Sequence, residues 1–343
     1  MRRPLTHAAT KFAAFVLLCA AALAANVADE PVIVDTGFVE QAAARGALLW
    51  DVRSQEEYRR GHIPGAVNID EIALVLRDPN TEDYIPVARI EQILGEAGID
   101  PTREIVFYGA KAHTSAYFGY VTVRYLGGSG ARVYHGGIDD WKAAGKPIAT
   151  DAVKLPPVSF RAQVNPEVIV STREVVARLG TPGVQIVDAR TEKEFNGGDI
   201  RALRGGHIPG AVNIPYEVNW VDPDTPLKLQ RRQVAGKDGM SLKPAQDLRA
   251  LYTRLDPEKE TIVYCQSGVR AAETATVLQS LGFRNVKVYD SSWLGYGNSF
   301  DGPAENVTYF NVGRVNGILM QMQQRIELLE GQIEELKAAK EKK

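Results

Sequence analysis

Residues 61–69 read GHIPGAVNI, and residues 206–214 read GHIPGAVNI a second time. Nine identical letters at two distant places indicate an internal repeat. The unit that repeats is longer than about 100 residues, which is too long for a solenoid and right for a duplicated domain. A chain of 343 residues accommodates two such domains. We therefore expect two copies of one domain.

The sequence around each copy follows one order. An apolar strand signal precedes the nine letters, at 48–53 in the first copy and at 185–190 in the second. Another apolar run follows at 105–108 and at 262–265, and after each come a helical stretch, a Leu-Gly turn, a further strand and a Trp. Short runs rich in Val and Ile, without strict alternation, are typical of strands buried on both faces of a parallel sheet. The sequence therefore predicts an α/β fold with two domains, each a parallel sheet flanked by helices.

Composition sets the domain boundaries. Residues 151–165 hold two adjacent prolines and no helical periodicity, which predicts a linker. This linker separates a first domain at 29–150 from a second domain at 166–305. The second copy also has extra charged, Pro-containing and Gly-containing residues between 216 and 244. We expect them to form a long surface loop.

The charge balance excludes some partners. Lys and Arg together number 40 and Asp and Glu 42, so the formal net charge is only -2. So small a charge gives no global field that would recruit nucleic acid or an anionic membrane. We expect no nucleic-acid partner.

The first residues differ from the rest of the chain. A basic start with Arg2, Arg3 and Lys11 leads into an apolar stretch from Phe12 to Ala25 that ends in small residues. This order is typical of a secretory signal, and the stretch is shorter than the roughly 20 residues that span a bilayer. We expect residues 1–28 to be removed, and the mature protein to be periplasmic or secreted without stable membrane insertion.

The tail, residues 312–343, shows an unbroken heptad seam. Spacings of three and four alternate, which predicts a long helix and favours a coiled coil; the alternative is an amphipathic helix packed on its own domain. Ile at one seam position and Leu at the other lean toward a parallel dimer, so we expect a homo-oligomer. The seam consists of Val312, Val315, Leu319, Met322, Ile326, Leu329, Ile333 and Leu336.

Cys265 is the one cysteine that remains after the signal is removed, because Cys19 lies in the apolar stretch. The mature chain can form no intramolecular disulfide, and its scattered histidines do not match zinc-ligand spacings. We expect no metal and no cofactor. Cys265 itself is either a small buried core residue or a functional thiol, and its neighbours decide between these two interpretations.

The loop Cys265-Gln266-Ser267-Gly268-Val269-Arg270 follows a buried strand and opens a helix. A loop in that place directs consecutive backbone N–H groups into one hollow, and the helix dipole adds positive potential. Gly268 allows a turn that a side chain would obstruct, and Arg270 adds a full positive charge. A thiol in such a hollow is expected to be a thiolate at neutral pH, which is the nucleophilic form.

Four motifs in this order resemble the rhodanese family of sulfurtransferases, in particular the exported bacterial members with tandem domains that act on thiosulfate or 3-mercaptopyruvate. The motifs are Asp188-Ala189-Arg190, Gly206-His207-Ile208-Pro209-Gly210-Ala211, the loop Cys265 to Arg270, and Tyr289-Asp290-Ser291-Ser292-Trp293. The resemblance covers nearly the whole chain between signal and tail. It implies that Cys265 takes a sulfane sulfur from a small donor, becomes a persulfide and passes the sulfur to a thiol or cyanide. It also implies that the backbone N–H groups of Gln266, Ser267, Gly268, Val269 and Arg270 cradle the bound sulfur or anion, and that Arg190 and Arg270 orient the charge of the substrate.

The first copy lacks this chemistry. Its equivalent loop, Tyr108 to Thr114, has no cysteine and cannot carry a persulfide, so we expect an inactive first domain beside an active second one. His62 of the first copy corresponds to His207 of the second, and Asp51 corresponds to Asp188. Because these residues occur also in the inactive copy, we expect all four to have structural roles.

Three alternative functions remain open. Phosphatases and arsenate reductases of related fold place five residues between cysteine and arginine, whereas four stand between Cys265 and Arg270 here, and the smaller loop suits sulfur. Gln266 and Ser267 are closer to members that use 3-mercaptopyruvate, while the cationic loop end favours thiosulfate or a polysulfide. The heptad seam would also suit a non-enzymatic persulfide carrier that serves a partner protein.

Overall fold

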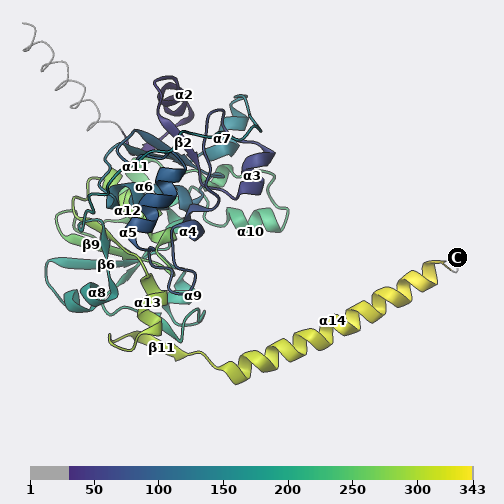
Figure 1. The fold of residues 1–343 in the computed structure, drawn as a ribbon. Coiled ribbons are helices and arrows are strands. Elements are labelled where there is room, and N and C mark those ends of the chain that lie inside the picture. Colours follow the sequence, from purple (N-terminus) through teal and green to yellow (C-terminus); the bar gives the residue numbers. More distant parts are fainter. Residues whose placement is uncertain (1–30, 342–343) are drawn as a thin grey trace, which may run out of the picture.

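The computed structural model describes residues 31–341, and Figure 1 shows two packed α/β domains with one long helix extending from them. The expected signal segment at 1–28 lies outside the described residues. Among the residues that are described, no helix combines the length and the apolar character needed to cross a bilayer.

The first domain is built on a four-stranded parallel sheet with strand order β1-β4-β3-β2. Its central strands are the runs that the sequence predicted, and every residue of β2, β3 and β4 is buried, which explains their apolar character. The strands are β1 (Ile33–Val34), β2 (Leu48–Asp51), β3 (Ile105–Tyr108) and β4 (Ala131–Tyr134), and the helices are α2 (Thr36–Ala44), α3 (Gln55–Arg60), α4 (Ile72–Val75), α5 (Val87–Glu96), α6 (Thr114–Tyr125) and α7 (Gly137–Ala143).

The second domain repeats this plan with a five-stranded parallel sheet in the order β5-β10-β9-β6-β8. The predicted duplication and the predicted parallel sheets flanked by helices are thus confirmed. The strands are β5 (Ile169–Val170), β6 (Val184–Asp188), β8 (Val212–Asn213), β9 (Glu260–Tyr264) and β10 (Val286–Tyr289), and the helices are α8 (Thr172–Arg178), α9 (Glu192–Phe195), α11 (Ala245–Leu251), α12 (Val269–Ser280) and α13 (Ser292–Asn298).

The two domains share one apolar core. Helices α6 and α12, each of which follows the loop after a central strand, pack against each other, and their buried side chains belong to one cluster. Tyr120 in α6 donates a hydrogen bond of 3.2 Å to Gln279 in α12. Because each domain covers a face of the other, removing one would expose apolar surface on its partner.

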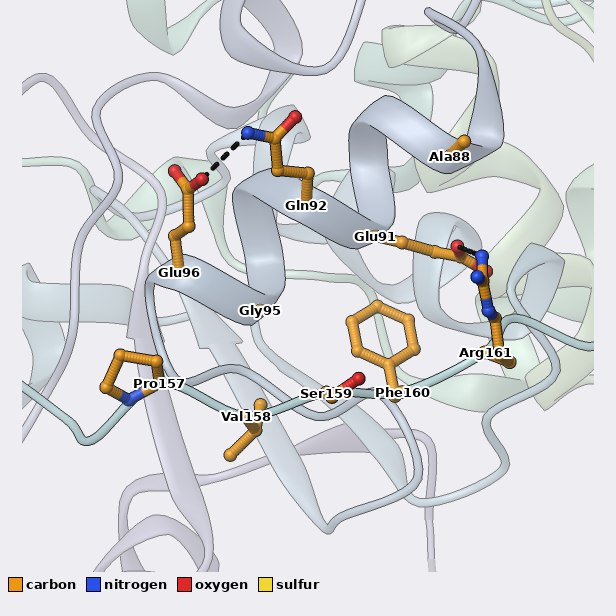
Figure 2. Close-up of a pocket in the computed structure, with 10 residues that line it drawn as sticks. All are labelled: Ala88, Glu91, Gln92, Gly95, Glu96, Pro157, Val158, Ser159, Phe160 and Arg161. Carbon is orange, nitrogen blue, oxygen red and sulfur yellow. Dashed lines mark hydrogen bonds and ion pairs between the residues drawn. The ribbon is translucent and has the colours of Figure 1, made fainter.

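The predicted linker is fastened to the first domain. Figure 2 shows residues 157–161 lying along α5, with Arg161 meeting Glu91 at 2.7 Å. The Val158 amide donates to the Gly95 carbonyl at 2.9 Å, and a Cβ on Gly95 would approach the Val158 carbonyl oxygen to 2.6 Å. A glycine is therefore required where the linker crosses the helix. A cavity of about 360 Å³ lies between the two segments.

The segment expected as a surface loop, 216–244, is more than a surface feature. It contains η1 (Tyr216–Asn219), α10 (Thr225–Gln230) and η2 (Asp238–Met240). Trp220 is 2% exposed and donates to the Glu273 carboxyl, while the Met240 carbonyl accepts from His135 of the first domain at 2.8 Å. Burial lowers the pKa of His135 to about 4, so its ring is neutral in this contact. The segment therefore ties the second domain to the first.

The tail helix α14 (Val312–Glu341) extends away from both sheets (Figure 1). It is joined to the second domain by β11 (Glu305–Tyr309), which pairs antiparallel with β7 (Arg204–His207). The predicted long helix is confirmed, and its seam is exposed, with Ile326 at 52% and Leu319 at 56%. The alternative of a helix packed on its own domain is therefore wrong.

Candidate active site at Cys265

Cys265 directly follows the carboxyl end of β9, which is an inner strand of the second sheet. It begins the loop that leads into α12. Ligands of parallel α/β sheets bind at this edge. The residue is 1% exposed, so the thiol sits at the bottom of its loop rather than on the surface. Its backbone N–H donates to the Ser292 hydroxyl at 3.1 Å, and that hydroxyl donates in turn to the Tyr289 carbonyl at 2.6 Å.

Three consecutive loop carbonyls are held on one side of the loop. The Cys265 carbonyl accepts from the Trp293 N–H at 3.0 Å, and the Gln266 carbonyl accepts from the Leu294 N–H at 2.8 Å. The Ser267 carbonyl accepts from the guanidinium of Arg77, a residue of the first domain. A trans peptide points its N–H opposite to its carbonyl, so the next three N–H groups face the other side. Successive N–H groups at a helix N-terminus form an anion-binding hollow.

Gly268 makes this loop geometry possible. Its φ is +82°, and a Cβ there would lie 2.6 Å from the Asp290 carbonyl oxygen. Both the left-handed backbone and the close approach exclude a side chain. The sequence prediction of a turn that needs glycine at this position is consistent with this geometry.

Arg270 brings positive charge to the thiol but does not act alone. Its guanidinium donates two hydrogen bonds to Glu194, at 2.9 and 2.8 Å, and Glu194 also lies 3.3 Å from Arg201. Burial opposes the charge on Arg270, yet its hydrogen bonds to Glu194 and the negative charge of Glu194 raise its pKa. Burial would likewise raise the pKa of Glu194, but Arg270 lowers it to about 2. The hollow thus contains a cation with its own carboxylate partner.

Arg190, a predicted substrate-binding residue, is bound by partners within its own domain. It is 1% exposed, its guanidinium binds the Asp188 carboxylate and the Gly206 carbonyl, and it stacks 4.5 Å over the ring of Trp293. Arg53 makes the same contacts to Asp51 and Gly61 in the first domain. The matching use of Arg53 and Arg190 in the two domains shows a structural role for both, and the predicted role of Arg190 in substrate binding stays a prediction.

The side chains of the other predicted loop residues, Gln266, Ser267 and Val269, lie in two different environments. The Gln266 side chain turns toward the 196–206 segment and donates to the Arg201 carbonyl at 2.7 Å. Ser267 and Val269 line a cavity of about 470 Å³ on the side of the first domain. The first domain contributes Ala73, Leu74, Arg77, Asp78, Pro79 and Glu82 to the same cavity.

Sequence reasoning missed Glu194, Arg201, Asp290 and Arg77. Glu194 could have been recognised as a helix cap, because Thr191 and Glu194 form a capping box, but that spacing does not reveal its bond to Arg270. Arg201 belongs to a segment without a counterpart in the first copy, where Tyr58 and the repeated histidine are almost adjacent. Arg77 carries no local signal at all.

The first-domain loop is filled from within. Gly109 follows β3 in the place of Cys265, and a Cβ on it would come within 2.7 Å of His113. Burial lowers the pKa of His113, so its ring is neutral there. The Lys111 N–H, which corresponds to a hollow-forming group of the second domain, donates to the Asp139 carboxylate at 2.7 Å. The first copy therefore lacks the thiol, and the Lys111 N–H of its loop is already bound to the Asp139 carboxylate.

A metal centre was not expected in either domain. Within residues 31–341, no three His, Cys, Asp or Glu side chains gather closely enough to hold a metal ion.

Comparison with known proteins finds relatives that span both domains. A family model described as "Rhodanese-like domain" matches residues 23–144 and again residues 171–299. A putative thiosulfate sulfurtransferase of Mycolicibacterium smegmatis is 31% identical over 293 residues, covering 81% of this chain and 99% of that protein. A thiosulfate sulfurtransferase of Corynebacterium glutamicum is 35% identical over 273 residues, covering 76% and 82%. The sulfur carrier protein TtuD of Thermus thermophilus is 31% identical over 256 residues, covering 70% and 84%.

Solved structures show the same architecture. The 3-mercaptopyruvate sulfurtransferase SseA of Escherichia coli superposes with a TM-score of 0.65 at 28% identity, covering 77% of this chain and 99% of that one. An anaerobic ergothioneine biosynthesis enzyme of Chlorobium limicola superposes with a TM-score of 0.67 at 22% identity, covering 80% and 70%, which is a likeness of fold.

The requirement for glycine at position 268 can be tested with a matched pair of substitutions. Gly282 has a φ of +98°, and a Cβ placed on it would meet nothing within 4 Å, so Gly282→Ala carries backbone strain alone, about 1 kcal/mol of unfolding free energy. Gly268→Ala adds the clash with Asp290 and should cost clearly more in urea unfolding. It should also slow alkylation of Cys265 by anionic iodoacetate more than by neutral iodoacetamide, because the hollow is distorted. Equal losses in the two variants would refute the clash as the constraint.

Proposed function

Because the chain belongs to the rhodanese family and is a rhodanese-type sulfurtransferase, we propose that Cys265 carries the sulfur as a persulfide. The donor is thiosulfate, or a polysulfide, and the acceptor is a thiol or cyanide. The observation that supports this most is a buried cysteine whose loop carbonyls are all held on one side, which directs the following N–H groups to the other, with Arg270 nearby. This arrangement is built for a nucleophile that stays anionic before and after it takes up sulfur.

The first half-reaction uses the thiolate of Cys265 as nucleophile. It attacks the outer sulfur of thiosulfate, a new S–S bond forms, and the old S–S bond breaks with its electron pair leaving on sulfite. The product on the enzyme is a Cys265 persulfide anion. The N–H groups of residues 266–268 stabilise negative charge in the starting thiolate, the transferring sulfur and the persulfide, so little rearrangement is needed.

The second half-reaction returns the enzyme to its starting state. An acceptor thiolate, or cyanide, attacks the outer sulfur of the persulfide, and the bond to Cys265 breaks with its electron pair returning to the Cys265 sulfur. The acceptor leaves as a persulfide or as thiocyanate. No redox cofactor enters this balance, because sulfane sulfur and its charge pass from donor to acceptor.

Thiosulfate is favoured as donor by two observations. The relatives named for thiosulfate sulfurtransferase are 31% and 35% identical over most of the chain, whereas the mercaptopyruvate enzyme is 28% identical. The hollow combines a helix N-terminus with Arg270, which suits a dianion. A relative named as a sulfur carrier supports a protein thiol among the acceptors.

Export and self-association complete the proposal. The basic start and apolar stretch of residues 1–28 support a protein that works in the periplasm or outside the cell. The partner for α14 is a second copy of this chain in a parallel coiled coil. Its apolar seam is exposed, and Ile and Leu alternate along its C-terminal half.

Charge along α14 supports the parallel arrangement. With Ile326 and Leu329 at the two seam positions, Arg325 and Glu330 flank the seam on opposite sides, where they would face each other between parallel chains. Gly317 and Gly331 lie on the outer face and weaken an isolated helix by about 1 kcal/mol each. The helix therefore gains from a partner that buries its seam.

The persulfide can be detected directly by intact mass. After incubation with thiosulfate, the wild type should gain one sulfur atom, and Cys265→Ser should gain none, because the nucleophile is missing. Adding a small thiol should then restore the original mass. A gain with 3-mercaptopyruvate but not with thiosulfate would reverse the donor assignment, and no gain with thiosulfate, a polysulfide or 3-mercaptopyruvate would refute sulfur transfer through Cys265.

Self-association can be tested by two glutamate substitutions in α14. Ile326 lies on the seam and Leu328 lies off it, although both are 52% exposed. Ile326→Glu should convert the dimer to a monomer because it places a charge in the seam, and Leu328→Glu should leave the dimer intact. Light scattering during gel filtration reads the mass. A monomeric wild type, or equal effects of the two substitutions, would overturn the coiled coil.

A further inference from the structure

We propose that Arg77, in the catalytically silent first domain, is a positioning residue for sulfur transfer, because it holds the persulfide loop of the second domain through Ser267 and Asp290. This inference rests on the proposed role of Cys265. It gives the first domain a function in the reaction, although that domain contributes no nucleophile.

Arg77 reaches across the domain interface from the segment between α4 and α5. Its side chain is 3% exposed, and its guanidinium lies 5.4 Å from the centre of the Phe118 ring. One terminal nitrogen donates to the Ser267 carbonyl, and the other lies 3.3 Å from both the carbonyl and the carboxylate of Asp290. Holding three acceptors at once requires the planar fork of arginine, which lysine cannot reproduce.

The contact with Ser267 fixes a peptide plane of the hollow. The carbonyls of Cys265 and Gln266 are held by backbone N–H groups of α13, within the same domain. The Ser267 carbonyl is held by Arg77 from the other domain. Because the peptide is planar and trans, this bond directs the Gly268 N–H away from Arg77 and into the hollow. A change at Arg77 should therefore reorient a group that faces the sulfur.

Asp290 connects the two sides of the interface. Its carboxylate accepts from the Tyr84 N–H at 2.9 Å as well as from Arg77, and its carbonyl oxygen is the atom against which Gly268 packs. Asp290 also belongs to the turn that precedes α13. A movement of this residue is therefore transmitted to the loop through Gly268 and through α13.

The same contact should depend on pH. Burial raises the pKa of Asp290 to about 6, while Arg77 and the Tyr84 N–H oppose that shift. The carboxyl is therefore ionised at neutral pH and becomes protonated below about pH 6, which weakens its pull on Arg77. The other titratable groups that face Asp290 are Glu82, Asp83, Tyr84 and Tyr125. Glu82 and Asp83 raise the pKa of Asp290 further, so they strengthen the dependence.

The test compares Arg77→Lys with Arg53→Lys. Arg53 is a buried arginine of the same domain that also binds a carboxylate and a carbonyl, but it does not touch the persulfide loop. The readout is the rate at which thiosulfate adds sulfur to Cys265, followed by quenched intact mass between pH 5 and pH 8, with thermal unfolding measured alongside. Thiosulfate does not titrate in this range. We expect Arg77→Lys to slow loading by about tenfold or more, as misplaced catalytic groups do, and Arg53→Lys to leave the rate of folded protein within about twofold.

Asp290→Asn supplies a second variant that keeps Arg77. The wild type should lose loading rate as the pH falls through about 6. Asp290→Asn should take up sulfur more slowly at neutral pH. Its rate should no longer show the fall near pH 6 that comes from Asp290, because the titrating carboxyl is gone. If Arg77→Lys does not fold, this variant decides the question.

The outcomes separate two failures. The positioning role would be overturned if Arg77→Lys and Asp290→Asn both took up sulfur at the wild-type rate and with the wild-type pH profile. A loss of rate in Arg53→Lys equal to that in Arg77→Lys would also overturn it, because general destabilisation would then explain both. A wild type that takes no sulfur from thiosulfate, a polysulfide or 3-mercaptopyruvate would instead refute the proposed function itself.

Discussion

Every feature of the site depends on the orientation of three peptide planes after β9. A loop can present its N–H groups to an anion only if the carbonyls of the same peptides find partners on the opposite side. Here α13 supplies two of those partners and the first domain supplies the third. The left-handed backbone of Gly268 then lets the chain turn into α12 without losing contact with Asp290. The thiol is thus held by a backbone arrangement to which both domains contribute.

The two domains contain the same strand–loop–helix arrangement, but the loop begins with Gly109 in the first domain and with Cys265 in the second. The scaffold was retained, since Arg53 and Arg190 make matching buried bonds in the two domains. In the first copy, the Asp139 carboxylate accepts the Lys111 N–H and also pairs with Lys237. The first domain has no thiol in this loop, yet through Arg77 it holds one side of the loop at Cys265.

The sequence predicted what depends on local pattern. Runs such as Ile262 to Tyr264 are buried on both faces of a parallel sheet, so their composition reveals them, and the loop at Cys265 follows from its place between strand and helix. The role of Arg190 in substrate binding was predicted from the family resemblance alone, and nothing in the sequence indicated that Asp188, two residues away, would bind its guanidinium. Arg77 and Ser267 are 190 positions apart, and a contact of that kind leaves no spacing in a single sequence.

The pairing of Arg270 with Glu194 changes how charge acts in the hollow. A donor anion that bound the guanidinium directly would have to replace two hydrogen bonds from a carboxylate whose pKa is lowered to about 2. The exchange gains little, because one anion replaces another on the same cation and the displaced carboxylate stays buried. The N–H groups carry no such competitor. Under the proposed mechanism they bind the transferring sulfur, while Arg270 acts through its charge and through its bond to Glu194 in α9. Under that mechanism, fixing those N–H groups matters more than adding positive charge, and Arg77 of the first domain fixes one of them.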